Sequence, residues 1–180
     1  MILSDRQIRA GIDFCKLVEG AKDNQINPAS VNLTLGNTFL TISPDQREYV
    51  LGEEVEYDRH EIPDSIGFAL EPGMFTLATT KERVNIPNGF AAFVQGRSSI
   101  GRVGLTTQNA GFVDPGFHGH ITLELVNESP STIILKPGYP VAQLVFFECY
   151  PSDKPYSGKY NDQIEATGSR MHKDEVNTCK

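Results

Sequence analysis

This sequence has fewer positive than negative charges. Its 16 lysine and arginine residues stand against 23 aspartate and glutamate residues, giving a net charge of -7 and an isoelectric point near 5.1. A nucleic-acid polymer is bound by a broad basic surface, so the composition argues against such a partner. A small anion needs only a few local arginines and stays compatible with this charge.

Long apolar runs and a cysteine framework are also missing. No stretch approaches the roughly 18 apolar residues of a membrane helix, and the start MILSDRQIRAG lacks the basic and apolar regions of a signal peptide. The cysteines, Cys15, Cys149 and Cys179, are odd in number and widely spaced, which fits neither a disulfide frame nor a zinc site. We therefore expect free thiols, no membrane partner and a cytoplasmic location, or the host cytoplasm if the source is viral.

The length of 180 residues, with 39% hydrophobic content, fits one globular domain with a real core. From Pro151 onward the sequence has almost no apolar periodicity. We therefore predict one domain over residues 1–150 and a flexible C-terminal tail over residues 151–180. The acidic span Ser43–Asp64 is weakly patterned, and we interpret it as a surface excursion.

One helix is predicted near the N-terminus. Ser4 is suited to cap it, Gln7 stands at the third helical position as in a capping box, and Ile8 and Ile12 fall on one face. Gly20 would close the segment.

The rest of the domain is predicted to be strands. Alternating or short apolar runs separated by Gly, Pro, Asn and Asp indicate an all-β sandwich or barrel. Three Pro-Gly sequences, at 71–74, 114–117 and 136–139, have the order expected for type II turns. The predicted strands are Val31–Leu35, Phe39–Ile42, Gly67–Leu70, Phe75–Thr79, Phe90–Val94, Ile121–Val126, Thr132–Leu135 and Val141–Phe147.

The stretch from Gln95 to Leu125 gathers most of the polar chemistry, with two arginines, two serines, an aspartate, a glutamate and six glycines in 31 positions. Arg97, Ser98, Ser99 and Arg102 supply guanidinium and hydroxyl groups on flexible backbone, which suits phosphate oxygens. The Walker spacing is absent. A nucleotide site is one interpretation, and a turn with surface arginines is the other.

Asp114 and Glu124 lie ten residues apart across a Pro-Gly turn. Glu124 alternates with Ile121, Leu123 and Leu125, so it should point to the opposite face of its strand from these apolar residues. Carboxylates in such places act as general base, ribose-hydroxyl acceptor or metal ligand, and they also occur as plain surface residues.

Several motifs together resemble one family. QGRSSIGR, NAGFVDPGF, ITLELVN, the Pro-Gly turn before VAQLVFF, and KYNDQ follow in that order, and MILSDRQI and PASVNLTLG open the chain. This set is similar to the deoxycytidine triphosphate (dCTP) deaminase family, whose fold is shared with trimeric deoxyuridine triphosphatases (dUTPases). Asn32 and Thr34 depart from the family's usual aspartate and arginine. The resemblance implies a distorted β-barrel or jelly-roll of the dUTPase-like type.

The resemblance also implies roles for residues of the central stretch. Glu124 would be the proton shuttle for hydrolytic deamination, and Ser98 and the Ala110 carbonyl would hold the attacking water. Arg97, Ser99 and Arg102 would bind phosphates and orient the base and Glu124. Gln108 would contact substrate as well. Of the tail, Tyr156, Lys159, Tyr160 and Gln163 would fold over the sugar and triphosphate.

Members of the family that both deaminate dCTP and cleave its triphosphate resemble this chain at Ala110-Gly111-Phe112. By analogy with the triphosphatases, Asp114 would contact the 3'-hydroxyl and help to activate water. The resemblance therefore favours a bifunctional enzyme that forms dUMP, ammonia and pyrophosphate for thymidylate supply. A deaminase that releases dUTP is the alternative.

The resemblance further implies a homotrimer in which the 97–102 loop of one chain faces Glu124 of its neighbour. Its small-molecule partners would be dCTP and dUTP, with dTTP as a candidate inhibitor. Mg²⁺ would be bound through the triphosphate and not by protein side chains. No zinc is expected, because the H-x-E and P-C-x-x-C motifs of zinc deaminases are absent.

Two other functions stay open. His118-x-His120-x3-Glu124 has the metal-ligand spacing of a cupin, although 136–147 lacks the further histidine that a cupin needs. A catalytically silent nucleotide-binding regulator on the same scaffold is the third interpretation. Ser98, Asp114 and Glu124 are all present, which speaks against it.

Overall fold

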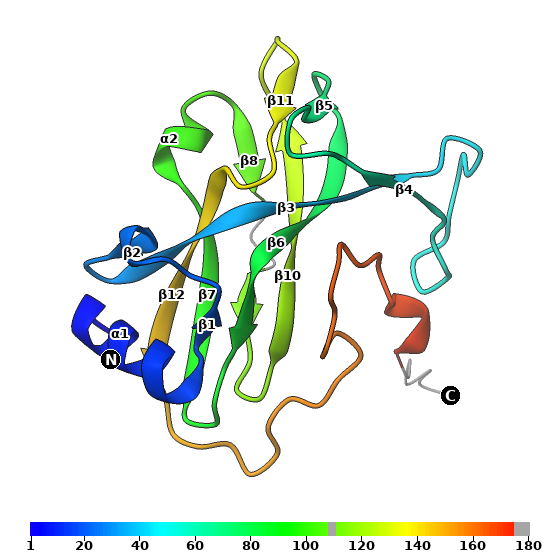
Figure 1. The fold of residues 1–180 in the computed structure, drawn as a ribbon. Coiled ribbons are helices and arrows are strands. Elements are labelled where there is room, and N and C mark those ends of the chain that lie inside the picture. Colours follow the sequence, from blue (N-terminus) through cyan, green and yellow to red (C-terminus); the bar gives the residue numbers. More distant parts are fainter. Residues whose placement is uncertain (108–110, 175–180) are drawn as a thin grey trace, which may run out of the picture.

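The computed structural model describes residues 1–107 and 111–174. Most of the strands belong to one curled antiparallel sheet (Figure 1). Its main path runs in the order β8-β10-β6-β3-β12-β7-β9, and the short strands β1, β2 and β4 pair with β6, β3 and β3. These strands are β1 (Val18–Glu19), β2 (Ile26–Asn27), β3 (Ser30–Ile42), β4 (Tyr57–Glu61), β6 (Phe75–Asn85), β7 (Phe90–Gly96), β8 (Leu105–Thr107), β9 (Phe112–Val113), β10 (His118–Asn127) and β12 (Pro140–Glu148).

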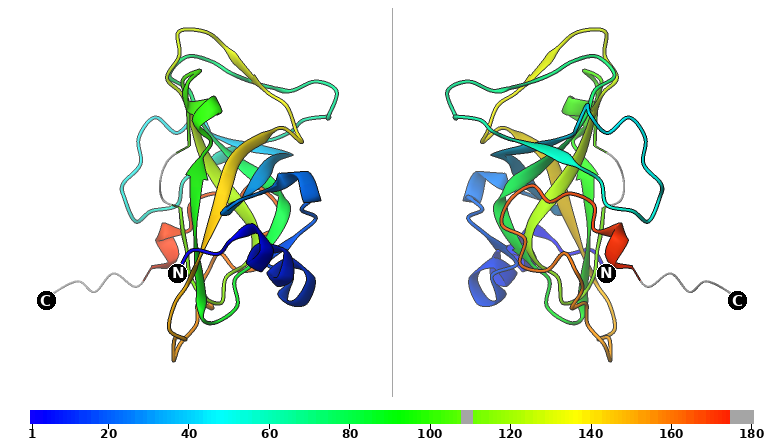
Figure 2. Two further views of the ribbon diagram at one scale, coloured as in Figure 1. Left: turned by 90° about the vertical axis from the view of Figure 1, so that its left-hand side faces the viewer. Right: turned by 90° about the vertical axis from the view of Figure 1, so that its right-hand side faces the viewer.

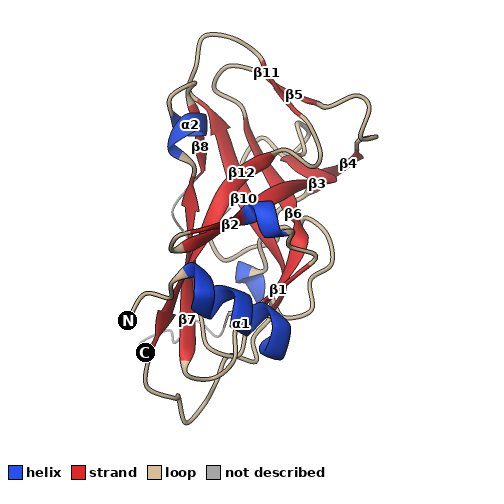
Figure 3. Ribbon diagram, turned by 60° about the vertical axis from the view of Figure 1, so that its left-hand side comes forward, coloured by secondary structure: helices blue, strands red, loops and turns tan. Residues whose placement is uncertain are grey.

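The remaining elements are short and lie around this sheet (Figure 3). A separate two-stranded sheet joins β5 (Phe68–Leu70) to β11 (Ile133–Leu135). The helical elements are α1 (Asp5–Cys15), α2 (Ser98–Gly101), and two 3-10 turns, η1 (Asp23–Gln25) and η2 (Met171–Lys173). Mainly β architecture of the barrel type is thereby confirmed. Among the described residues, no helix has the length and apolar character required to cross a membrane.

The core lies inside the curl of the sheet and follows the two-residue period of its strands. Along β10, every second residue from Gly119 to Asn127 is buried. Phe39 of β3 is fully buried and stacks on Phe68 of β5 with ring centroids 4.7 Å apart. Burial of such side chains is the main favourable contribution to folding.

The N-terminal helix begins as predicted and ends earlier. The Gln7 side-chain oxygen accepts a hydrogen bond of 2.9 Å from the Ser4 backbone N-H, and the capping box is complete. The helix ends at Cys15 because Lys16 takes the left-handed conformation, with φ of 56°, and the Leu17 N-H donates back to the Gly11 carbonyl. Gly20 also has a positive φ, but it lies beyond the helix, after β1.

All three Pro-Gly turns have the predicted geometry. Gly73, Gly116 and Gly138 have φ of 75°, 96° and 80°. In each turn the fourth residue donates its N-H to the carbonyl of the first, at 3.0, 3.1 and 3.1 Å. The turn at 114–117 matters most for function, because it delivers the chain into β10.

The short strands β1, β2, β8 and β9 were not predicted, and the longer strands differ from the sequence prediction in two further places. The predicted runs Val31–Leu35 and Phe39–Ile42 form one strand, β3, with a register shift against β6 between Leu35 and Phe39. The acidic span Ser43–Asp64 contains β4, which pairs with β3. The sequence concealed this strand because β4 is largely exposed and carries charged residues on both faces.

Residues 151–174, which we call the C-terminal strap, leave β12 and return to the β10 side of the sheet (Figures 1 and 2). The Tyr156 N-H donates to the Pro115 carbonyl at 2.7 Å, and the Ala166 N-H donates to the Thr38 hydroxyl at 3.1 Å. The strap therefore crosses the molecule from the 114–117 turn to β3.

Candidate nucleotide site

A cavity of about 520 Å³ lies between the sheet and the strap. Its walls come from β4, β6, β7, β8, β9 and β10 on one side and from strap residues between Tyr156 and Ser169 on the other. Most of the lining is apolar or hydroxylic, and its described part contains two carboxylates, Asp114 and Glu124. Apolar walls with few polar groups are typical of small-molecule sites.

Glu124 stands on the face of β10 that turns away from the core, as the alternation predicted. Its neighbours Leu123 and Leu125 are buried at 2% and 0% exposure, and it pairs in register with Leu77 of β6. Partial burial raises the pKa of the Glu124 carboxyl above its ordinary value. A carboxyl of this kind can take up and release protons closer to neutral pH than an exposed one.

Asp114 opens the turn that precedes β10 and lines the same cavity. Three residues earlier, at position 111, close packing requires glycine. A Cβ on Gly111 would lie 2.5 Å from the Val94 carbonyl oxygen, and the Val94 N-H donates to the Gly111 carbonyl at 2.8 Å. This contact gives the Ala-Gly-aromatic sequence a steric cause, since a side chain at position 111 would push the Asp114 turn away from β7.

Three of the four predicted strap residues line the cavity: Tyr156, Tyr160 and Gln163. The fourth, Lys159, is absent from the lining and forms an ion pair with Asp174. The Tyr156 hydroxyl accepts a hydrogen bond of 3.1 Å from the Tyr160 N-H, which fixes the two aromatic rings relative to each other.

Two buried polar atoms at the cavity have no hydrogen-bond partner among the described residues. One is the side-chain oxygen of Gln163, whose amide nitrogen donates to the His120 carbonyl at 2.6 Å. The other is the hydroxyl of Thr107, on β8. Buried polar atoms are almost always paired, so both are positions where a polar ligand would complete the bonding.

The predicted arginine loop, residues 97–102, does not line the cavity of its own chain. Arg97, Ser98, Ser99 and Arg102 belong to α2 and its flanks, and none of them lines the cavity. The Arg97 guanidinium donates to the Pro140 carbonyl at 2.9 Å, and Arg102 donates to the Ser98 hydroxyl at 3.4 Å. One chain thus brings Asp114, Glu124 and the strap together and leaves the arginines apart. Gln108 and Ala110 lie outside the described residues.

Sequence reasoning missed several polar residues of the cavity. Tyr57 comes from the acidic span, and its hydroxyl accepts from the Ser169 N-H at 3.2 Å. Thr122 accepts from the Thr167 N-H at 3.1 Å. Thr122 stands two residues before Glu124 and therefore on the same face of the strand, and that spacing was a usable signal. Tyr57 had none, because its strand was not recognised.

The two histidines of the metal-site alternative make contacts within the protein. The ring nitrogens of His118 lie 3.1 Å from the Gly116 carbonyl and 3.1 Å from a carboxylate oxygen of Asp162. Nδ1 of His120 lies 3.0 Å from the Thr80 carbonyl. Within residues 1–107 and 111–174, no three His, Cys, Asp or Glu side chains are grouped as a metal site.

The fold and its cavity define a β-barrel protein of the dUTPase-like class. A solved dCTP deaminase from Agrobacterium tumefaciens superposes with a TM-score of 0.63 at 24% identity, covering 81% of this chain and 47% of that one. The dUTPase of phage phi11 of S. aureus superposes with a TM-score of 0.51 at 16% identity, covering 79% of this chain and 92% of that one.

Sequence comparison narrows the class to a family. The family model described as dCTP deaminase-like matches residues 2–149. A relative from Persephonella marina named dCTP deaminase, dUMP-forming, is 43% identical, covering 97% of this chain and 99% of the relative. A relative of the same name from Methanobrevibacter smithii is 37% identical over 96% of both chains. The chain belongs to the dCTP deaminase-like family.

Proposed function

We propose that this protein hydrolyses dCTP to dUMP, ammonia and pyrophosphate in the cavity beneath the strap. The observation that carries the proposal is the pair of carboxylates, Glu124 and Asp114, brought into one cavity from a strand and from the turn before it. Their placement supports two hydrolytic steps in one site. The near full-length relatives named dCTP deaminase, dUMP-forming, support the same reaction.

The deamination step requires a group that first accepts a proton and then donates it. Water must lose a proton as it attacks C4 of the cytosine, and the departing ammonia must gain one. We assign both transfers to Glu124, because partial burial raises its pKa and a carboxyl near its titration point can accept and return a proton. We propose that Ser98 of a neighbouring subunit and the Ala110 carbonyl hold the water.

The triphosphate needs cations that the described lining of this cavity does not contain. Arg97 and Arg102 are the cations of the central stretch, and α2 holds them away from Glu124 of the same chain. We therefore propose a homotrimer in which Arg97, Ser99 and Arg102 of a neighbouring subunit bind the phosphates. A monomer in light scattering of the active enzyme would contradict this arrangement.

The second step is cleavage of the triphosphate, which we assign to Asp114. Its place at the start of the turn lets it accept a hydrogen bond from the 3'-hydroxyl and orient the attacking water. We expect Asp114→Asn to abolish pyrophosphate release, because the variant keeps the size of the side chain and loses its basic oxygen. Full pyrophosphate release by this variant would remove Asp114 from the assignment.

We propose that Mg²⁺ binds together with the nucleotide, through its triphosphate. The ion prefers phosphate oxygens and water, and it neutralises the charge of the triphosphate. The donor set of the cavity fits this mode, since its two carboxylates, Asp114 and Glu124, are fewer than a protein cage would require. Tyr156, Tyr160 and Gln163 would fold over the sugar and the triphosphate from the strap, and Lys159 would reach the phosphates after leaving Asp174.

The test is incubation of the protein with dCTP and Mg²⁺, with chromatographic separation of the nucleotides and an assay of pyrophosphate. We expect dUMP and pyrophosphate in equal amounts with little dUTP. Accumulation of dUTP would show a deaminase that stops at the first step. Loss of added dUTP with no turnover of dCTP would show a triphosphatase, and dCTP binding without turnover would show a silent regulator.

A further inference from the structure

The strap joins β10 by main-chain hydrogen bonds at one point. The Asp162 N-H donates to the His118 carbonyl at 2.8 Å, and the His120 N-H donates to the Gln163 carbonyl at 2.9 Å. Gly119 lies between the two histidines with φ of 149°, and a Cβ there would come within 3.2 Å of the Gln163 backbone. The glycine therefore allows the strap to approach.

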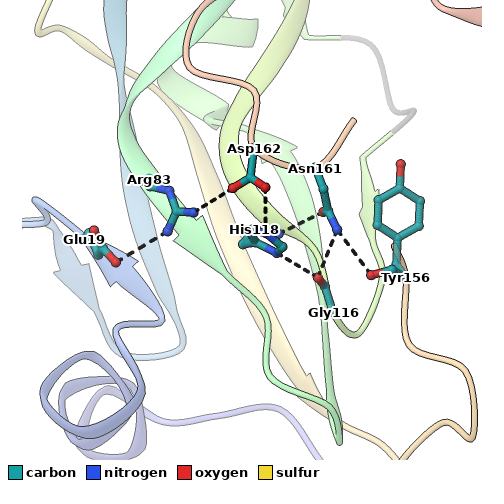
Figure 4. A network of polar contacts seen from close by, with 7 residues as sticks. All are labelled: Glu19, Arg83, Gly116, His118, Tyr156, Asn161 and Asp162. Carbon is teal, nitrogen blue, oxygen red and sulfur yellow. Dashed lines mark hydrogen bonds and ion pairs between the residues drawn. The ribbon is translucent and has the colours of Figure 1, made fainter. Parts of the chain in front are cut away.

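Asp162 adopts a conformation that side chains disfavour. Its φ is 58°, in the left-handed region that Asp and Asn tolerate better than most residues. Both carboxylate oxygens are bound at this point (Figure 4). One lies 3.3 Å from a guanidinium nitrogen of Arg83 on β6, and the other lies 3.1 Å from the His118 ring on β10. Asp162 is thus tied to two strands of the wall.

We call the contacts of Asp162 with Arg83 and His118 the anchor. Contacts of neighbouring residues extend it on both sides. Arg83 also pairs with Glu19 of β1 at 3.5 Å. Asn161 accepts from the His118 N-H at 3.2 Å and donates to the Tyr156 carbonyl at 3.3 Å (Figure 4). The anchor therefore lies between Tyr156 and Gln163, two strap residues that line the cavity.

We propose that Asp162 is a positioning residue for the nucleotide site: its carboxylate, bound by Arg83 and His118, holds Gln163 in the cavity. The inference rests on the proposed function for its kinetic consequence. Gln163 is 9% exposed and adjoins Asp162 directly, so the backbone conformation at 162 sets where the Gln163 amide lies. The free side-chain oxygen of Gln163 is then available for a ligand before any nucleotide arrives.

The contacts of Asp162 with Arg83 and His118 should act on the position of the strap and not on the fold of the barrel. The Asp162 side chain is 72% exposed, and those of Arg83 and His118 are 33% and 36% exposed. Pairs this exposed contribute little to global stability. Their effect should therefore appear in nucleotide affinity and in local opening of the strap.

Asp162→Asn tests the proposal, because asparagine tolerates the same φ while it removes the charge and one of the two acceptor oxygens. We expect KM for dCTP to rise about fivefold with kcat unchanged within about twofold. Arg83→Met should give the same result, and the double variant should be no worse than either single one, since both remove the same contact. Asp153→Asn is the matched control, an exposed strap aspartate without an ion pair among the described residues. An unchanged KM in both variants, or a loss confined to kcat, overturns the proposal.

A second readout needs no nucleotide and no activity. Trypsin cleavage after Lys159, followed by mass spectrometry, reports opening of the strap. We expect severalfold faster cleavage in Asp162→Asn and Arg83→Met and a wild-type rate in Asp153→Asn. Asp162→Gly, which relieves the φ, should also open the strap, and equal melting temperatures would show intact barrels. Wild-type cleavage rates in all variants overturn the proposal even if the enzyme turns over no dCTP, so the anchor and the proposed function fail separately.

Discussion

The wall formed by β10 and β6 and the strap that crosses it are held by different interactions. The wall is an antiparallel ladder with one register shift between His120 and Thr122, and one of its faces lies in the core, where Leu123 and Leu125 are almost fully buried. The described strap buries only Gln163 and Ala166, packs Tyr156 and Tyr160 partly against the core, and is otherwise attached by isolated hydrogen bonds and ion pairs. Glu124 belongs to the wall, and Gln163 belongs to the strap.

This difference separates two tasks. A proton shuttle must keep its geometry through every turnover, and a packed ladder provides this because its opening requires loss of core burial. Groups that enclose a substrate must also release the product, and a segment held by exposed polar contacts can open at a small free-energy cost. The following predictions test this separation, because each changes a residue of the wall that either carries the proton shuttle or contacts the strap.

The largest effect is expected from Glu124→Gln. The variant keeps the hydrogen-bonding shape and loses the group that moves protons, so deamination should fall by about 10²- to 10⁴-fold. Stopped-time chromatography of dCTP turnover measures this. Glu128→Gln, at an exposed residue just after the same strand, should keep full activity. A Glu124→Gln enzyme with more than a tenth of wild-type kcat would place the shuttle elsewhere.

A smaller effect is expected from Gly119→Ala. The added methyl group meets the Gln163 backbone at 3.2 Å and must adopt φ near 149°, which side chains rarely do. We expect a KM for dCTP raised about tenfold and a loss of about 1–3 kcal/mol in the free energy of unfolding. Denaturant unfolding and steady-state kinetics measure the two. Gly138→Ala is the control for backbone strain, since φ there is 80° and a Cβ would meet nothing within 4 Å.

The smallest effect is a change in stability with pH. The folded-state pKa of Glu124 is raised by burial above the ordinary 4.5, so the folded protein holds this proton more tightly than the unfolded chain. The stabilisation is present at low pH and is lost as pH rises through the folded-state pKa. Glu124→Gln should therefore melt at a higher temperature than wild type at pH 7.5, and the difference should shrink toward pH 4. A difference in melting temperature that stays constant across this pH range would contradict a raised pKa of the Glu124 carboxyl.

Local chemistry explains why much of the fold was predictable. The capping box at Ser4 and Gln7 and the three Pro-Gly turns depend on residues next to each other in the chain, and all were confirmed. The alternation that placed Glu124 opposite Leu123 depends only on the pleat of one strand. Strand β4 was missed because its exposed charged residues carry no such alternation.

The site was predictable to a different degree. The resemblance of motifs pointed to Asp114, Glu124, Tyr156, Tyr160 and Gln163, and all five line one cavity. The roles of these residues stay predictions. The anchor of Asp162 was not foreseen, because its partners on β6 and β10 are 79 and 44 residues away.

The sequence by itself determined the class of fold, the turns and the face of β10 that carries Glu124, because these follow from backbone preferences and from a period of two residues. It also carried the family motifs that identify the chain. Only the tertiary structure decided which polar groups share a cavity, how burial raises the pKa of Glu124, and that the arginine loop lies away from that cavity in one chain. These depend on distances across the sheet and on exclusion of water, which arise only when remote segments pack together.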